Sequence, residues 1–374
     1  MSARNGRKNI SSVIFSVTGV IIIAKLLGFV KQMATSGAFG ATLDTDIINI
    51  AQNVIGDIEY VLAHVLMTSF ISVYLNAAEE GGERVARFAK NAMRAFLVIA
   101  VAVAAVLTAA AFPLARLLAP SYDAAASSRL AAYLRVYSPL VILFVVTAVN
   151  QGLLNANRRF VAVEARSIPQ SLIMIAVIAV AGRAIGADAL VVGFLIYTVF
   201  NTVWFWMLSR KYRAGTSADK FTQVFRDPLV RRLLGMSAPL LVGYSAYYIN
   251  QQINKSLASG LGEGAVTELS YGAVLFNLVT AFIASFASIM FSYVTSAIAG
   301  GEHDRAAELA NRTAALLAAV FLPVTLVCLT LAPEISRIAF GRGVFSDKNV
   351  AATAAALAGY SFSFLPLVLQ EVYG

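Results

Sequence analysis

The chain contains a succession of apolar stretches, each long enough to cross a membrane as a helix. Crossing a hydrocarbon layer takes about 20 predominantly apolar residues in helical form. Such stretches occur at residues 10–37, 46–76, 88–112, 130–155, 164–185, 188–209, 233–257, 267–299, 312–333 and 350–373. Because only helices and closed barrels satisfy every backbone polar group inside lipid, these stretches predict an all-α polytopic membrane protein with about ten transmembrane helices.

The composition and the placement of the basic residues agree with a membrane protein. Charged residues make up only 13% of the chain and hydrophobic residues 59%, whereas a soluble domain has about 25% charged residues. If the N-terminus is cytoplasmic, 19 of the 29 Lys and Arg residues fall in cytoplasmic segments and 7 in external ones. Cytoplasmic loops of membrane proteins carry this excess. The counts predict a cytoplasmic N-terminus, and the net charge of +9 requires no nucleic-acid partner.

The two halves of the sequence share short motifs at a nearly constant offset. Ser-Gly pairs at 36–37 and 259–260 are 223 residues apart, and Tyr-Ser pairs at 137–138 and 360–361 have the same spacing. The matches suggest a parallel duplication of six helices, a plan in which two lobes are related by an axis along the membrane normal. Such a plan is typical of transporters, with a cavity between the lobes.

The repeat divides the chain into three predicted parts. These are an N-terminal six-helix lobe at 1–208, a cytoplasmic linker at 209–228 and an incomplete C-terminal lobe of four helices at 229–374. Under the offset, Gly374 corresponds to Gln151, which lies inside a predicted helix. We therefore expect the chain to be truncated at its C-terminus relative to a protein with further helices.

Ionisable residues inside the apolar stretches are the candidate functional residues. Lys25 and Lys31 lie in the first stretch, Asp57 and Glu59 in the second, and Lys255 in the seventh. A charge at the centre of a bilayer costs at least ~2.5 to 3.5 kcal/mol, so such residues usually face a polar interior. Two interpretations stay open. Lys25 and Glu59 form a structural ion pair, or the charges line a water-filled cavity that receives an anionic or protonatable substrate.

Few residues offer catalytic or metal chemistry. The only histidines are His64 and His303, and the only cysteine is Cys328. No loop carries a nucleophile with a neighbouring base, and no metal-ligand spacing occurs. We predict that the chain is not an enzyme, has no catalytic or metal site and needs no cofactor. Coupling to an ion or to the membrane potential stays open.

Four motifs indicate a family: AKLLGFVKQ, GAFGATLDTDIINIAQNV, GLLNANRRF and YYINQQINKSLASG. On these the chain resembles the MviN/MurJ family of lipid II flippases, within the wider MOP superfamily of transporters. The family begins with a basic-x-L-G-F-x-basic motif, followed by a small-residue turn with Phe-Gly and then an Asp. The residues in those places here are Lys25, Gly28, Phe29, Lys31, Phe39, Gly40 and Asp46.

The resemblance implies a flippase that moves an undecaprenyl-pyrophosphate-linked peptidoglycan precursor, lipid II, across the bacterial cytoplasmic (inner) membrane by alternating access. The substrate-binding residues expected from it and from the buried charges are Lys25, Lys31, Asp46, Asp57, Glu59 and Lys255. Lys25 and Lys31 would engage the pyrophosphate, and Asp46 would support the outer gate. The expected partners are the lipid-linked precursor, membrane lipids and the cell-wall synthesis machinery.

The chain departs from the family pattern at several arginines. Arginines of the first helix are lysines here, the second helix has Glu59 and Tyr60 where the family has Arg, and the eighth has Ala273 or Val274. The cationic cavity of the family is therefore thinned and partly inverted in sign. Two alternatives follow: a MOP-type exporter of another polysaccharide lipid or a drug, with Asp57 and Glu59 binding a cation or proton, or a non-transporting scaffold of the same fold.

Overall fold

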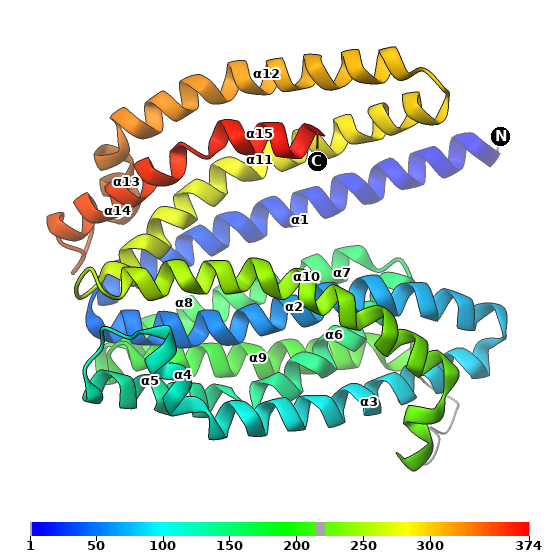
Figure 1. Ribbon diagram of the computed structural model, residues 1–374, viewed down its shortest axis with the longest axis horizontal. Helices are drawn as coiled ribbons and strands as arrows, with labels where there is room; N and C mark the ends of the chain where they lie inside the picture. Colours follow the sequence, from blue (N-terminus) through cyan, green and yellow to red (C-terminus); the bar gives the residue numbers. More distant parts are fainter. Residues whose placement is uncertain (1, 214–220, 374) are drawn as a thin grey trace. The chain divides into compact units, whose positions relative to one another are not determined.

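The computed structural model describes residues 2–213 and 221–373, and these residues form helices with no β-strand among them (Figure 1). The helices are α1 (Ser2–Phe39), α2 (Leu43–Glu79), α3 (Gly82–Ala109), α4 (Ala111–Leu118), α5 (Ala124–Tyr137), α6 (Leu140–Ala156), α7 (Phe160–Glu164), α8 (Ser167–Ile185), α9 (Asp188–Ser209), α10 (Pro228–Ala258), α11 (Ala265–Ala299), α12 (His303–Thr330), α13 (Ala332–Phe340), α14 (Asp347–Ser361) and α15 (Phe364–Tyr373), with the 3-10 helices η1 (Arg210–Arg213) and η2 (Phe221–Arg226). This architecture confirms the predicted all-α fold class.

Each of the ten predicted spans coincides with a helix or a pair of helices. By length and composition, seven helices of the described chain qualify as membrane spans, and the pair α5 and α6, bent by 43°, makes an eighth. Helix α10 occupies another predicted position without meeting the same criterion, and within α11 the searched residues Ala265–Ala281 form a shorter apolar helix. Polar side chains in the middle of α10, described below, explain part of this difference.

Local sequence sets several helix boundaries. The bend between α5 and α6 falls at Pro139, which has no N–H to continue the helical hydrogen bonds. Asp123 caps α5 by accepting a 2.7 Å hydrogen bond from the Ala126 amide. Ser346 and Asn349 form a reciprocal capping box at the start of α14. These caps satisfy N–H groups that the first turn of a helix leaves without partners.

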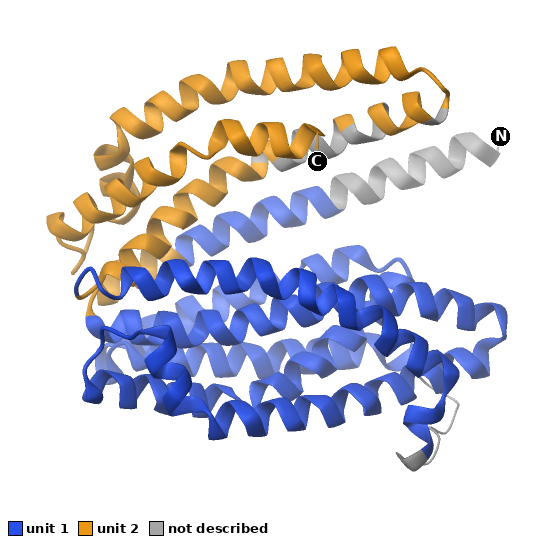
Figure 2. Ribbon diagram, viewed as in Figure 1, with its two compact units in different colours: residues 1–31, 43–262 blue, residues 32–42, 263–374 orange. Residues whose placement is uncertain are grey.

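The first compact unit consists of residues 1–31 and 43–262 (Figure 2). Helix α2 packs against α6, α10 and α5, and α6 also packs against α9 and α3. Fully buried aromatic and aliphatic side chains, among them Phe70, Phe88 and Leu233, form a hydrophobic core of this unit. Helix α2 is therefore central to this unit.

The second compact unit consists of residues 32–42 and 263–374 (Figure 2). Helix α11 packs against α12, α14 and α15, and Phe321 and Phe364 are buried between them. The units differ from the predicted lobes, since α10 packs with the first unit and residues 32–42 with the second. The lobes at 1–208 and 229–374 stay a prediction, and part of the predicted linker, residues 214–220, lies outside the described residues.

Candidate functional site

The middle of α2 presents a polar and aromatic stripe. Asp57, Tyr60 and His64 are three and four residues apart, a spacing that places them on one helix face. The same rule groups Tyr244, Tyr248 and other polar residues on α10, which packs directly against α2. The two stripes meet where Gln252 bonds to Asp57 and where Tyr60 stacks on Tyr248.

Glu59 is held by an arginine that the sequence did not point to. The Nη1 atom of Arg166 donates to Oε1 of Glu59 at 3.0 Å, and the two side chains are only 16% and 13% exposed. Arg166 directly precedes α8. The interpretation that pairs Glu59 with Lys25 is therefore wrong about the partner. The placement of Glu59 among substrate-binding residues stays a prediction, because this carboxylate already has a buried counter-charge.

Asp57 links α2 to α10. The Gln252 side-chain amide donates to Oδ2 of Asp57 at 2.5 Å, and Lys255 adds an electrostatic attraction from the next turn of α10. Asp57, Gln252 and Lys255 are all half-buried. Asp57 and Lys255 were predicted as substrate-binding residues without a contact between them, and that role stays a prediction. The sequence did not identify Gln252 as the residue that bonds to Asp57.

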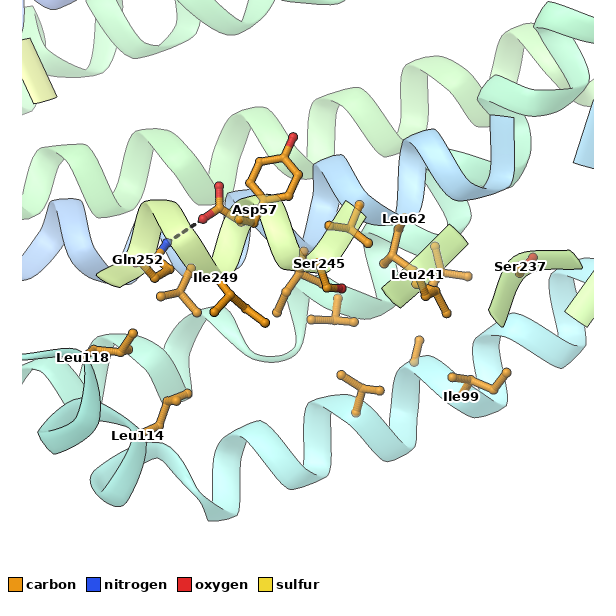
Figure 3. Close-up of a pocket in the computed structure, with 18 of the residues that line it drawn as sticks. Asp57, Leu62, Ile99, Leu114, Leu118, Ser237, Leu241, Ser245, Ile249 and Gln252 are labelled. Carbon is orange, nitrogen blue, oxygen red and sulfur yellow. Dashed lines mark hydrogen bonds between the residues drawn. The ribbon is translucent and has the colours of Figure 1, made fainter. Parts of the chain in front are cut away.

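A cavity of about 890 Å³ lies beside this link, within the first unit (Figure 3). Its walls come from α2, α3, α4, α6 and α10 and are mainly aliphatic, with Ile99, Leu114 and Leu241 among them. The polar lining residues are Asp57, Ser237, Ser245, Tyr248, Gln252 and Ser256. Because Asp57 and Gln252 bond to each other at its edge, the cavity suits an apolar group better than a charged one.

Aromatic rings form a continuous cluster on the α2 and α10 stripes. Tyr60 and Tyr248 are stacked, with centroids 6.3 Å apart and planes 11° apart. Tyr247 meets Tyr248 edge-on at 5.1 Å, and His64 lies 5.4 Å from Tyr244. These tyrosines were not among the functional residues predicted from the sequence. The signal was present in GYSAYYINQQINKS, where aromatic residues recur at helical spacing in the middle of a span.

The lysines of α1 and Asp46 have different environments. Lys25 is exposed and Lys31 is half-buried. Asp46 is fully buried in the first turn of α2. Burial, and then the nearby Asp46 carboxylate, raise the pKa of Tyr122 in the loop between α4 and α5. The predicted roles of these three residues stay predictions.

The two glycines of the motif differ in whether the structure requires a glycine at their positions. Gly40 has φ +66°, and a Cβ there would lie 3.3 Å from the Val344 carbonyl oxygen. A Cβ on Gly28 would meet no atom within 4 Å. Phe29 and Phe39 are both half-buried. Gly40 thus has a backbone reason to be glycine, whereas the packing around Gly28 gives none.

A second polar cluster lies at the start of α3 and α10. Arg84 binds both carboxylate oxygens of Asp227, at 2.8 and 3.1 Å, and Asn91 donates to the same carboxylate at 3.0 Å. The Leu229 amide donates to it at 3.0 Å, so Asp227 also caps α10. Burial alone would raise the pKa of Asp227, but these hydrogen bonds outweigh it and lower the pKa below its usual value. Arg84 was not among the functional residues predicted from the sequence.

Comparison with known proteins gives a consistent result. The family model described as "Lipid II flippase MurJ" matches residues 35–373. A probable lipid II flippase MurJ from Rhizobium meliloti (strain 1021) is 25% identical over 372 residues, which cover 96% of this chain and 68% of that protein. The lipid II flippase MurJ from Burkholderia cenocepacia is 22% identical, with coverage of 97% of this chain and 72% of that protein.

Solved structures show the same fold. A lipid II flippase MurJ in an inward closed conformation has a TM-score of 0.81 at 17% identity, with 95% of this chain and 74% of that chain covered. An inward-facing multidrug resistance MATE family transporter of the MOP superfamily has a TM-score of 0.71 at 14% identity, with coverage of 96% and 84%. At these identities the likeness concerns the fold alone.

Proposed function

Because the chain belongs to the lipid II flippase MurJ family, whose model matches residues 35–373, we propose that it moves lipid II across the bacterial cytoplasmic membrane. The family is one of multi-pass membrane transporters rather than enzymes. The family match over nearly the whole chain is the observation that carries the proposal. In this proposal the N-terminus is cytoplasmic, and the cell-wall synthesis machinery uses the transported precursor.

The placement of Lys25 supports a role in binding the head group. Its ammonium is exposed although it lies in an apolar segment of α1 that qualifies as a span. An exposed ammonium at this depth needs water or an anion near it, since hydrocarbon satisfies neither its charge nor its hydrogen bonds. The pyrophosphate of lipid II supplies such an anion, and lysine binds phosphate as a point charge.

Reconstitution tests the proposal. The purified chain in liposomes should accelerate the movement of fluorescent lipid II between leaflets. Lys25→Ala should slow it, whereas Lys25→Arg should be milder, because a guanidinium retains the charge and binds phosphate. Arg183→Ala removes an exposed cation near the end of α8 and is the matched control. Absence of any acceleration by the unmodified chain would reject the flippase function.

Cation-coupled export is a second candidate function, favoured by the half-buried Asp57 carboxylate at the cavity edge. In this case a proton or Na⁺ gradient across the liposome should drive uptake of an organic cation, and Asp57→Asn should abolish that uptake. Accelerated lipid II movement without a gradient, together with no uptake of organic cations, would reject export.

A further inference from the structure

The face of α10 that carries its tyrosines is polar and aromatic in the middle of the helix. Tyr247 is 62% exposed and Tyr60, across on α2, is 49% exposed. Asn250 and Asn254 are also exposed and lie one and two turns beyond Tyr247. The amide of Gln251 donates to the Tyr247 hydroxyl at 3.1 Å. We call this set of residues, with Tyr244 and Tyr248, the tyrosine platform.

The platform does not fit contact with lipid. Tyrosines that anchor a membrane protein lie at the two interfaces, whereas Tyr60 is near the midpoint of α2 (Leu43–Glu79) and Tyr247 lies well inside α10 (Pro228–Ala258). Exposed Asn250 and Asn254 side chains would lose their hydrogen bonds in hydrocarbon. The face therefore meets a polar environment that is partly lined by aromatic rings.

The geometry of the rings leaves flat surfaces available. Tyr60 and Tyr248 are nearly parallel, with planes 11° apart, so their stack presents an outer ring face. Tyr247 stands edge-on to Tyr248 and adds a second wall. A tyrosine ring offers an apolar face and a hydroxyl at its edge. Amide side chains beside the rings supply donors and acceptors in both directions.

A pyranose ring has the complementary chemistry. Its axial C–H bonds form an apolar face, and its hydroxyl and N-acetyl groups project from the rim. The apolar face stacks on an aromatic ring while amides and phenol hydroxyls bond to the rim. A pyrophosphate would instead need cations, and the exposed polar side chains of the platform, Tyr60, Tyr247, Asn250 and Asn254, are uncharged.

We propose that the tyrosine platform binds the amino-sugar disaccharide of the substrate, with Tyr60 and Tyr247 as the stacking residues. The assignment rests on the proposed function, because the flippase substrate is what brings a disaccharide to this face. It divides recognition of the head group: lysines of α1 bind the pyrophosphate, and α2 with α10 binds the sugars. Glu59 and Tyr60 stand where the family has an arginine. On this proposal the site is retained, and a stacking contact from Tyr60 replaces the contact of a cation.

Binding of a soluble sugar tests the platform without the lipid. The probe is a β-1,4-linked disaccharide of N-acetylglucosamine, observed by saturation-transfer NMR on the purified chain in nanodiscs. Tyr60→Leu and Tyr247→Leu should each weaken binding by roughly threefold to tenfold, the value of one aromatic contact. Tyr60→Phe should retain binding to within about twofold, because the ring stays in place.

The control is Phe200→Leu on α9, which removes a ring that is 38% exposed and stacked on Trp204 but lies outside the platform. It should leave sugar binding unchanged. Melting temperatures should be similar for all variants, and Tyr247→Leu serves if Tyr60→Leu does not fold. Equal sugar binding by the unmodified chain and both leucine variants would overturn the platform, and displacement of the sugar by inorganic pyrophosphate would assign the site to phosphate.

Lipid II translocation separates the two proposals. If the sugar binds through the tyrosines but liposomes show no lipid II movement, the flippase function fails and the platform stands. If liposomes move lipid II and Tyr60→Leu leaves both sugar affinity and the lipid II KM unchanged, the platform fails alone. The expected result is a raised KM for Tyr60→Leu with a nearly normal KM for Tyr60→Phe.

Discussion

Two carboxylates in the middle of α2, those of Asp57 and Glu59, each have a compensating neighbour in the first unit. Glu59 has Arg166, and Asp57 has Gln252 with the charge of Lys255 one turn away. Removing one member of a buried pair leaves an unpaired charge, which costs more than the pair itself contributes. The pairings therefore make opposite predictions for variants of Lys25 and Arg166.

Arg166→Ala should lower the free energy of unfolding by about 3 to 5 kcal/mol, because it leaves the Glu59 carboxylate without its counter-charge. Lys25→Ala should leave stability nearly unchanged, since Glu59 keeps Arg166. The double variant Arg166→Leu with Glu59→Leu should recover most of the loss. Thermal unfolding in detergent measures all three, and a larger loss for Lys25→Ala than for Arg166→Ala would contradict the observed pairing.

Asp227→Asn should reduce stability at neutral pH by about 1.5 to 3 kcal/mol, the value of hydrogen bonds to a charged group. Asparagine still caps α10, so the loss of stability reports the contribution of the carboxylate charge alone. The folded pKa of Asp227 is lowered, so its stabilisation is present above the unfolded pKa of about 3.9 and is lost as pH falls through the lower folded value.

Unfolding measured from pH 7 down to about pH 3 checks this. The Asp227→Asn variant should lose less stability over the acid part of the range than the unmodified chain. Glu80→Gln is the control, because Glu80 also contacts Arg84 at 3.3 Å but its side chain is 56% exposed. A loss from Glu80→Gln as large as that from Asp227→Asn would assign the effect to general surface charge.

The loop between α13 and α14 is fitted against the C-terminal end of α1 within the second unit. The Val344 amide donates to the Gly37 carbonyl at 3.1 Å. Gly343 has φ +63°, and a Cβ there would lie 2.0 Å from the same carbonyl oxygen. The contact therefore depends on a glycine for both its backbone angle and its close approach.

An alanine in the left-handed conformation costs about 1 to 2 kcal/mol. Gly343→Ala should destabilise the second unit by more than this, because the loop must also move away from the Gly37 carbonyl. Gly301→Ala in the same unit also replaces a glycine of positive φ, +77°, but a Cβ there meets nothing within 4 Å. It should show only the conformational cost. Hydrogen exchange of the Val344 amide gives a local readout, and equal losses in the two variants would show that the close approach contributes nothing.

The sequence predicts helices better than it predicts their contacts. Each of the ten apolar runs coincides with a long helix or a helix pair, because hydrophobic length is a local property. The short helices α4, α7 and α13 were not predicted as separate elements. The partner of Glu59 was missed because Arg166 is 107 residues away and reads as one of several loop cations. The stripe on α10 was a missed local signal, since Tyr244, Tyr247 and Tyr248 follow helical spacing.

The distribution of basic residues over the whole chain predicts its orientation. Of the 29 Lys and Arg residues, 19 fall in segments that a cytoplasmic N-terminus places inside. Long apolar helices alone do not fix the direction of insertion, whereas the retention of cations on the cytoplasmic side does.

Cysteine labelling in intact cells tests the orientation, after Cys328, the only native cysteine, is replaced by alanine. Glu302→Cys, in the exposed turn before α12, should react with an impermeant maleimide only after the membrane is opened. Glu263→Cys, in the exposed turn before α11, should react in intact cells. The reverse pattern would invert the topology.

The contact between Gly37 and Val344 has a consequence for synthesis of the protein. At about 5 to 20 residues per second, the ribosome adds Val344 roughly 15 to 60 seconds after Gly37. During that interval the C-terminal end of α1 has been synthesised, but the loop between α13 and α14 that packs against it has not. Insertion factors or chaperones that shield early helices should therefore remain bound until translation reaches α14, and ribosome-bound chains stalled before that point should be the ones most easily degraded.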